Sequence, residues 1–453
     1  RKGFHVAIVR GFSCFLALSA GLTGCSGLGR SLPPASRAAA GTTVNFYSAQ
    51  ASLPSPIRHV VIIFQENRTA DYMFQDVPGA DVAKYAIDSR GKRVALLPVS
   101  LAAPYGLAHS RGAFLRDYDG GKMDGFDSRL PPGERLRPYG YGVRSEIRPY
   151  RDMAVQYVAA DHMFQSNRGP SYPAHLYIVS GTATEPKIDD YRVSANPFDT
   201  RTKRPEGGGC DARPGTVVAT AGLQRGGRGP ALFPCLDRPV LPDLLDERHV
   251  SWRYYQHGRG PGLWHGLNSI RHVRFGPDFK NVVSPSETIL TDIARGRLAG
   301  MSWVMPDPEH SDHAGSNSAA GPSWVAAVVN AIGKSQYWNN TAIFVTWDDW
   351  GGWYDHVPPP VDNACELGFR VPLIVISPYA KRGYVSKVQH EFGSLLAFTE
   401  ETFGIPKGAL GATDKRADDL SDAFDFTQKP RAFVPIKAPP FSPGPPNDQS
   451  EDP

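Results

Sequence analysis

Several strands that this sequence predicts end in polar or acidic residues. In the 453-residue chain, the apolar run Ala342–Thr346 leads within two positions into Asp348 and Asp349. A short, continuous and β-branched run of this kind is typical of a strand buried on both faces of a parallel sheet. Ligands of α/β proteins gather beyond the carboxyl ends of such strands. The pattern therefore favours a binding site at this point, and an ordinary charged surface loop is the alternative interpretation.

The residues that follow the two aspartates fit the same interpretation. Gly351 and Gly352 allow the backbone to turn sharply and to approach a ligand closely. Asp355 and His356 come directly afterwards, within reach of the same turn. We therefore expect the whole stretch to bring polar side chains together around one ligand.

Three further apolar runs predict strands of the same sheet. His59–Phe64 ends next to Glu66 and Asn67, Leu298–Val304 runs into a segment rich in Asp, Glu and His, and Leu373–Ile376 is the fourth run. Strands that alternate with helices predict a largely parallel α/β sheet. The expected helices, each closed by a glycine, are Ser286–Arg295, Ser323–Ile332 and Glu391–Phe403.

The N-terminal residues predict export. Residues 1–24 combine positive charges with a short apolar run and end just before Cys25, the pattern of a bacterial lipoprotein signal peptide. A chance run of small residues before a cysteine is the alternative. Residues 25–56 are rich in Ser, Ala, Gly and Pro and predict a lipid anchor on Cys25 followed by a flexible tether. We expect attachment to the membrane through this lipid, in a Gram-negative cell envelope.

Composition describes the rest of the chain. Residues 57–425 form the predicted folded domain, and residues 426–453 form a Pro-rich tail that is expected to be extended or disordered. The apolar fraction of 41% is enough for a sizeable core. The net charge of +4 includes three positive residues of the signal segment, so the remaining chain is near neutral and composition gives no case for a nucleic-acid partner. The sequence makes no prediction of the oligomeric state.

The cysteines predict one disulfide. Cys210 and Cys235 lie in the same glycine-rich, irregular region and would pair in an exported protein. Cys14 leaves with the signal segment, and Cys365 is expected to be a buried, inert thiol.

Carboxylates grouped at strand ends need a ligand, and an all-oxygen set suits a hard divalent cation. Ser171 follows Gly169 and Pro170, at a turn that can open onto a helix whose N-terminal N–H groups favour an anion. A serine beside a divalent cation can lose its proton and act as a nucleophile. These residues predict metal-assisted chemistry on an anionic group.

Five motifs, taken in order, resemble those of the bacterial phosphoesterases that comprise phosphatidylcholine-type phospholipases C and a metal-dependent acid phosphatase. They are Val61–Asp71, Gly120–Phe126, Gly169–Pro173, Trp347–Pro359 and Leu367–Leu373. That family has an alkaline-phosphatase-like fold, so the resemblance implies a three-layer α/β/α sandwich around a mainly parallel sheet, with residues 57–425 as the catalytic domain.

The resemblance also implies a metal site. Glu66, Asn67, Ser171, Asp348 and Asp349 match the family positions that surround one divalent metal ion, for which Ca, Mg, Mn and Zn are candidates. Ser171 would attack phosphorus and form a phosphoserine, which water then hydrolyses. Capping of a helix is the alternative interpretation of Glu66 and Asn67.

Four histidines match the family positions that hold phosphoryl oxygens or protonate the leaving group: His109, His265, His313 and His356. A histidine with a pKa near neutrality can supply the proton that a departing alkoxide requires. His175, which lies four residues after Ser171, is expected to be structural or to support the site from outside.

Departures from the phospholipase pattern bear on the substrate. Ser171 stands where the phospholipase branch has Thr, His175 stands where it has Arg, and Asp349 stands where it has Glu. Ser171 and the pair Asp348 and Asp349 resemble the acid phosphatase branch, so a phosphomonoesterase is the first hypothesis and a phospholipase C is the alternative. A catalytically silent envelope protein that binds phosphorylated ligands is a second alternative. Trp350, Trp353 and Tyr354 could stack on a nucleotide, line a lipid groove or simply pack.

Overall fold

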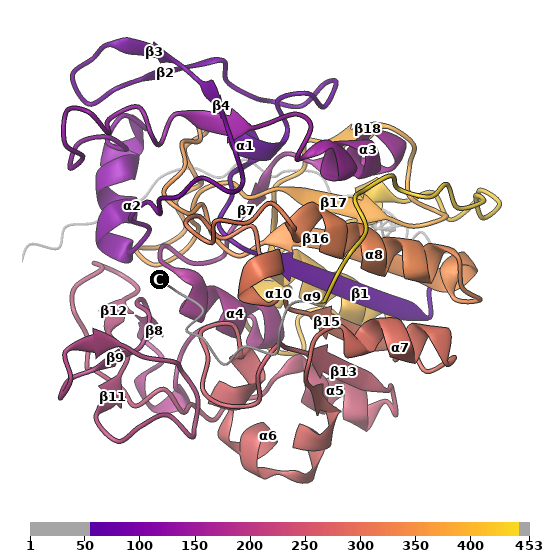
Figure 1. The fold of residues 1–453 in the computed structure, drawn as a ribbon. Coiled ribbons are helices and arrows are strands. Elements are labelled where there is room, and N and C mark those ends of the chain that lie inside the picture. Colours follow the sequence, from indigo (N-terminus) through magenta and orange to yellow (C-terminus); the bar gives the residue numbers. More distant parts are fainter. Residues whose placement is uncertain (1–54, 444–453) are drawn as a thin grey trace, which may run out of the picture. The chain divides into compact units, whose positions relative to one another are not determined.

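An eight-stranded sheet forms the centre of the computed structural model, which describes residues 55–443 of the chain (Figure 1). Neighbouring strands pair in parallel except at β17, which is antiparallel to both of its neighbours. In spatial order the strands are β14 (Val282–Val283), β13 (Trp252–Tyr255), β15 (Met301–Val304), β1 (His59–Gln65), β16 (Thr341–Trp347), β17 (Leu373–Ile376), β6 (Val158–Ala160) and β18 (Tyr384–Ser386).

The four predicted apolar runs all become strands of this sheet, and the prediction of a mainly parallel α/β fold is confirmed. β17 is the exception to the parallel arrangement. Its first residue, Leu373, pairs with Thr346 near the end of β16, so β17 begins at the edge where Asp348 lies and ends at the opposite edge. The short strands β13 and β6 carry weaker patterns and are not among the predicted runs.

Helices cover both faces of the sheet because side chains of a strand point alternately to its two sides. Phe64 of β1 packs edge-on against Phe392 with ring centroids 5.1 Å apart, whereas Trp347 of β16 packs against Tyr150 on the other side at 4.9 Å. The face of Trp347 is covered by α3 (Arg148–Gln156) and α8 (Gly321–Gly333), with α7 (Thr288–Ala294) beside α8; the face of Phe64 is covered by α4 (Ser171–Ser180) and α9 (Phe392–Thr402).

Smaller elements surround this core. Two-stranded and three-stranded ribbons are formed by β2 (Tyr85–Ile87) with β3 (Arg93–Ala95), β4 (Leu97–Val99) with β5 (Gly140–Gly142), β7 (Met163–Phe164) with β19 (His390–Glu391), β8 (Tyr191–Val193) with β12 (Thr220–Gly222), and β9 (Phe198–Asp199) with β10 (Arg204–Pro205) and β11 (Thr216–Val217). The remaining α-helices are α1 (Ala70–Met73), α2 (Arg111–Tyr118), α5 (Leu241–Glu247), α6 (Arg271–Phe275) and α10 (Thr413–Arg416).

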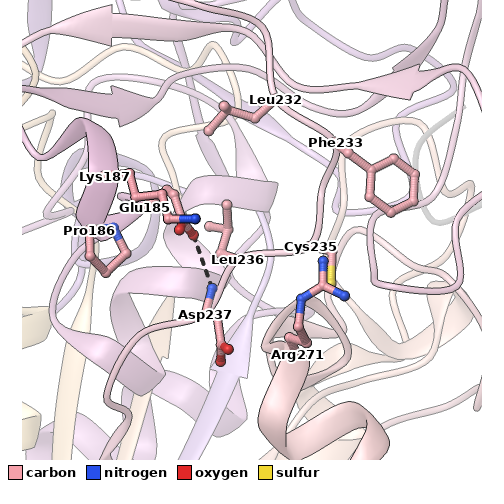
Figure 2. A pocket seen from close by; sticks show the side chains of 9 residues that line it. All are labelled: Glu185, Pro186, Lys187, Leu232, Phe233, Cys235, Leu236, Asp237 and Arg271. Carbon is pink, nitrogen blue, oxygen red and sulfur yellow. Dashed lines mark hydrogen bonds between the residues drawn. The ribbon is translucent and has the colours of Figure 1, made fainter.

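The glycine-rich region 196–234 contains only short ribbons and irregular backbone, and the predicted disulfide between Cys210 and Cys235 is present. Figure 2 shows the surface hollow beside this bridge, where Arg271 lies next to Cys235. Opposite, the carboxylate of Glu185 accepts a hydrogen bond from the backbone N–H of Asp237 at 3.1 Å. The residues that line the hollow include none of the predicted site residues.

The C-terminal segment differs from a free tail. Residues 427–443 form neither helix nor strand, but they lie along α8 and contribute to its packing. The amide of Asn330 exchanges two hydrogen bonds with the backbone of Ile436, and the indole N–H of Trp338 donates to the carbonyl of Arg431 at 2.7 Å. Phe441 packs against Trp324 with ring centroids 5.0 Å apart. Aromatic side chains among the prolines therefore bind this part of the segment to the domain.

The predicted signal peptide, the lipid-modified Cys25 and almost all of the tether lie outside the described residues. Between residues 55 and 443, no helix combines the length and the apolar composition that a membrane crossing would require.

Candidate metal centre and nucleophile

The ends of β1 and β16 bring the predicted acidic residues together. These strands pair in parallel along their whole length, with Gln65 opposite Trp347. The next residues, Glu66 and Asp348, therefore leave the sheet side by side, and the N–H of Asp348 donates to the carbonyl of Gln65 at 2.9 Å. Both side chains are fully buried. The sequence prediction that strand ends form the site is consistent with this pairing.

Backbone N–H groups fix one oxygen of each aspartate. Asp348 Oδ1 accepts hydrogen bonds from the N–H groups of Asn67 and Asp349, at 2.9 and 2.7 Å. Asp349 Oδ1 accepts from the N–H of Gly351 at 2.7 Å. The other oxygen of Asp348, Oδ2, is buried and has no hydrogen-bond partner. A buried carboxylate oxygen without a partner is costly unless a cation lies against it.

Ser171 begins helix α4 and faces these carboxylates. Its hydroxyl donates to Asp349 Oδ2 at 3.3 Å, and the side chain is 1% exposed. Pro170 precedes the helix, so the fixed backbone angle of proline lies just outside the first turn. Unpaired N–H groups at the start of a helix favour an anion at this point. The structure thus places the predicted nucleophile beside the predicted metal ligands.

Asn67 adopts a left-handed backbone conformation with φ of 60°. Strained residues of this kind persist only where the surroundings hold them in place. Here Arg68 donates to the carbonyl of Asn67 at 2.8 Å, and its guanidinium lies over the rings of Tyr72 and Trp353, 4.9 and 5.3 Å from their centroids. Because Gly351 has no side chain, the backbone of Asn67 can lie against it; a Cβ at this position would be 2.5 Å from the carbonyl oxygen of Asn67.

The side-chain amide of Asn67 lies between the two carboxylates and His313. One end of the amide lies 3.1 Å from Asp348 Oδ1 and from Asp349 Oδ1, and the other end lies 2.7 Å from His313 Nε2. His313 Nδ1 lies 2.9 Å from the carbonyl of Ala314, so Nδ1 carries the hydrogen and Nε2 of the neutral ring is an acceptor. With the amide nitrogen toward His313, the amide oxygen faces the two carboxylates, and a cation among the three oxygens would stabilise them. In the opposite orientation the amide nitrogen donates to both carboxylates, and the amide oxygen accepts from His313 Nε2.

His175 has a larger part in the site than the sequence indicates. It lies on α4 one helical turn after Ser171, is fully buried, and its Nε2 lies 2.9 Å from Glu66 Oε1. Ligand atoms of Glu66, His175 and Asp348 all lie within 4.8 Å of one another, so His175 either binds the ion or orients Glu66. The i, i+4 spacing of Ser171 and His175 on one helix face is the signal that could have identified it.

The rings of His109 and His265, like that of His313, are each held by a contact between Nδ1 and a backbone carbonyl. Nδ1 of His109 lies 2.8 Å from the carbonyl of Leu107, and Nδ1 of His265 lies 2.9 Å from the carbonyl of Gly260. In the neutral form each ring therefore carries its hydrogen on Nδ1 and offers the Nε2 lone pair. The rings of His109 and His313 are 5.8 Å apart, which places His109 next to the metal centre.

His265 lies further from His109 in the same group of rings, and His257 lies beside it. The sequence did not predict His257 as a site residue. The ring centroids of His257 and His265 are 5.2 Å apart, and Trp264 connects them to His313, with ring centroids 6.3 Å from both His257 and His313. His257 follows the unpredicted strand β13 at the same edge of the sheet as His313. Recognition of that strand would have identified this residue.

His356 is not placed to hold a phosphoryl group, contrary to the expectation from the resemblance. Its Nδ1 lies 2.9 Å from Asp71 Oδ2, and its Nε2 lies 3.2 Å from Asp81 Oδ1, so both ring nitrogens are occupied by carboxylates. Burial would lower the pKa of His356, but the hydrogen bond and the charge of Asp71 raise it above its usual value. The fully buried Arg370 binds both oxygens of Asp355 in the same group. His356 therefore belongs to a structural ion network under the turn.

The aromatic residues of the turn also have a structural part. Trp350 and Trp353 are fully buried and Tyr354 is 5% exposed, so packing is the correct interpretation among the three that the sequence leaves open. Trp350 packs edge-on against His109 with ring centroids 6.2 Å apart, and its indole N–H donates to Asp117. These rings shape the wall of the site and offer no exposed surface for a lipid chain.

The residues present fit a single divalent cation. The donors are carboxylate and amide oxygens, one serine hydroxyl and one imidazole, and the buried Oδ2 of Asp348 lacks any other partner. Carboxylate and amide oxygens are the ligands of hard cations, and the imidazole also admits zinc or manganese. The predicted ligands Glu66, Asn67, Ser171, Asp348 and Asp349 come together through the contacts described above.

The profile of the Phosphoesterase family matches residues 57–406. Phospholipase C A of Mycobacterium tuberculosis is 26% identical over 448 residues, which cover 84% of this chain and 79% of the relative. Hemolytic phospholipase C of Pseudomonas aeruginosa is 25% identical, with 82% of this chain and 56% of the relative covered. A solved alkaline phosphatase superfamily protein from Vibrio parahaemolyticus superposes with a TM-score of 0.38 at 12% identity, covering 81% of this chain and 71% of the other.

Proposed function

Because the chain belongs to the phosphoesterase family and is a phosphoric ester hydrolase, we propose that it cleaves phosphomonoesters through attack by Ser171. The observation that carries this proposal is the position of the Ser171 hydroxyl, 3.3 Å from Asp349 at the start of α4 and beside the Asn67 amide group. Phosphoryl transfer chiefly requires in-line positioning and neutralisation of charge, and both are available here.

Each residue then has a defined part in the reaction. The hydrogen bond to Asp349 directs the Ser171 proton away from the substrate, so an oxygen lone pair can face phosphorus. A divalent ion held by Glu66, Asn67, Ser171, Asp348 and Asp349 would supply positive charge against the phosphoryl oxygens and lower the pKa of the serine hydroxyl. Attack by Ser171 Oγ breaks the bond between phosphorus and the ester oxygen, and the leaving alkoxide takes a proton.

His109 is the residue that we assign to this proton. Its ring is held through Nδ1, it lies next to His313, and it is only partly buried, so a substrate can reach it. Protonated His109 gives its Nε2 proton to the alkoxide, and the neutral ring then accepts a proton from the water that hydrolyses the phosphoserine. His313 orients Asn67. His257 and His265 extend the imidazole-lined wall, where rings that carry a proton on Nε2 would donate to further phosphoryl oxygens.

A phospholipase C activity is the second candidate, and the relatives named phospholipase C support it. The buried state of Trp350 and Trp353 supports the monoesterase instead, because neither ring is exposed to contact an acyl chain. A monoester carries one more negative oxygen than a diester, and a site with several imidazoles can stabilise it. We also propose that the protein is exported and lipid-anchored at Cys25. The disulfide supports export, because such bonds persist outside the cytosol, and the anchor rests on the sequence pattern before Cys25.

The test is hydrolysis by wild type and Ser171→Ala of an aryl phosphomonoester, an aryl phosphodiester and phosphatidylcholine vesicles, with and without a chelator. We expect the monoester to be the best substrate, the chelator to abolish its hydrolysis, and the variant to lose at least about 10³-fold in kcat/KM. Ser302→Ala is the matched control, because Ser302 is a buried strand serine whose hydroxyl has no hydrogen-bond partner. Faster turnover of phosphatidylcholine would establish the phospholipase, and no turnover of any ester would favour the silent binding protein.

A further inference from the structure

A buried histidine and two aspartates form a separate group at the start of β19. His390 is fully buried and begins β19, whereas Asp418 and Asp422 follow α10 and are partly exposed. One ligand atom of each residue lies within 4.8 Å of the others. None of these residues takes part in the phosphoesterase site described above.

The hydrogen bonds of Ser386 determine which nitrogen of His390 carries a proton. The Ser386 hydroxyl donates its only hydrogen to Asp422 Oδ2 at 2.5 Å. Ser386 Oγ also lies 3.0 Å from His390 Nε2, and in this contact it can only accept. Nε2 of His390 therefore carries the hydrogen, and Nδ1 of the neutral ring presents a lone pair.

This lone pair meets a carboxylate. Asp418 Oδ1 lies 2.9 Å from His390 Nδ1. Burial would raise the pKa of Asp418, but the closeness of His390 lowers it; Nδ1 has no other hydrogen-bond partner. Asp422 Oδ1 is likewise buried without a hydrogen-bond partner and lies 3.7 Å from the ring. A carboxylate oxygen and an imidazole lone pair at 2.9 Å repel one another unless a proton or a metal cation lies between them, and the second buried carboxylate oxygen favours the metal cation.

We propose that His390, Asp418 and Asp422 bind a divalent cation of the zinc type at a site separate from the catalytic centre. One imidazole nitrogen and two carboxylate oxygens form a ligand set that zinc accepts in proteins, with water able to complete the coordination. The hydrogen bond from Nε2 to Ser386, which in turn binds Asp422, is the kind of contact that orients a metal-bound imidazole.

The site would brace the segment that carries the nucleophile. His390 pairs with Met163 in the β7–β19 ribbon, and the neighbouring Glu391 accepts a hydrogen bond from the hydroxyl of Ser166 at 2.9 Å. Ser166 lies five residues before Ser171. A cation that joins β19 to the segment after α10 would therefore stabilise the support of the nucleophile without touching substrate.

The experiment measures zinc binding directly in full-length protein that carries Asp348→Asn, which weakens the catalytic metal site. After removal of metal with a chelator, the protein is titrated with Zn²⁺ by calorimetry, and bound zinc is counted by elemental analysis after dialysis. We expect one equivalent of zinc per chain and a rise in the thermal unfolding midpoint on zinc addition. When Asp422→Asn or Asp418→Asn is introduced into the Asp348→Asn protein, the affinity for zinc should fall at least about 100-fold, because a ligand is lost.

Asp419→Asn is the matched control, because Asp419 lies between the proposed ligands in sequence but outside the cluster and accepts only a local bond from the N–H of Ser421. It should leave zinc binding unchanged. Two results would overturn the proposal: no bound zinc in the Asp348→Asn protein, or equal zinc binding by the Asp422→Asn and Asp419→Asn proteins. In either case a proton on His390, and not a metal ion, would balance the charge of the two carboxylates. The measurement does not depend on activity, so its failure is distinguishable from failure of the phosphomonoesterase.

Discussion

Gly351→Ala tests whether the turn after β16 holds Asn67 in position. The residue has φ of 59°, a conformation in which a side chain costs about 1–2 kcal/mol. An added Cβ would lie 2.5 Å from the carbonyl oxygen of Asn67 and 2.6 Å from its Cβ, whereas ordinary contact begins at 3.4 Å. The backbone of Asn67 must therefore move by several tenths of an ångström or more, and it carries the amide that faces Asp348 and Asp349.

The size of the effect follows from this displacement. A misplacement of about 1 Å in a catalytic constellation costs about 10²-fold in rate. We expect Gly351→Ala to lose about 10²-fold in kcat/KM toward the aryl phosphomonoester and to bind the activating metal more weakly. Its free energy of unfolding should also fall, by more than the backbone strain alone.

Gly411→Ala separates strain from displacement. Gly411 has φ of 71°, and an added Cβ there meets no atom within 4 Å, so only the strain of about 1–2 kcal/mol should appear. Unfolding by denaturant, initial rates and metal titration are measured on both variants. If the two variants have the same kcat/KM and metal affinity, the contact between Gly351 and Asn67 does not position the site, and the reasoning is refuted.

Three further predictions concern residues around the site. His356→Gln should lower stability but change kcat/KM less than about tenfold, whereas a loss of the 10²-fold or more typical of a proton-transfer residue would restore its catalytic role. Burial raises the pKa of Asp117 to about 7, so the folded state binds more protons than the unfolded state above pH 4, and stability falls as the pH rises to 7. Asp117→Asn should therefore gain about 3 kcal/mol relative to wild type between pH 5 and pH 8 in denaturant unfolding, and a constant difference would contradict this. Replacing both Cys210 and Cys235 by Ser should lower the free energy of unfolding by roughly 3 kcal/mol, and an unchanged unfolding midpoint would count against it.

Sequence reasoning predicted the fold well where local pattern determines structure. The runs at β1, β16 and β17 are short, continuous and rich in β-branched residues, so they identify themselves as buried strands, whereas β15 (Met-Ser-Trp-Val) is marked by the acidic residues and histidines that follow it. The direction of β17 is not encoded in that pattern, because parallel and antiparallel central strands bury the same residues. Phe441 shows a second limit, since composition marks its Pro-rich segment as a tail while its ring packs against Trp324.

Positions that immediately follow a strand were also predictable, because the sheet register carries them to one edge. Glu66 and Asp348 meet for this reason and needed only the pairing of β1 with β16. His175 was harder to recognise, since its contact with Glu66 joins a helix to a strand end across 109 positions of sequence.

His356 shows why proximity along the chain to a metal ligand does not establish a role. It follows Asp349 by seven residues, and both lie in the same motif, but the left-handed glycines at 351 and 352 reverse the chain between them. After that reversal the ring meets Asp71, which lies on α1 and has no sequence signal that links it to this loop. The carboxylates of Asp71 and Asp81 then occupy both ring nitrogens, so the same turn that presents Asp349 to the ligand holds His356 in the ion network beneath it. A motif therefore fixes which residues are present, whereas the positive φ angles inside it decide which of them reach the substrate.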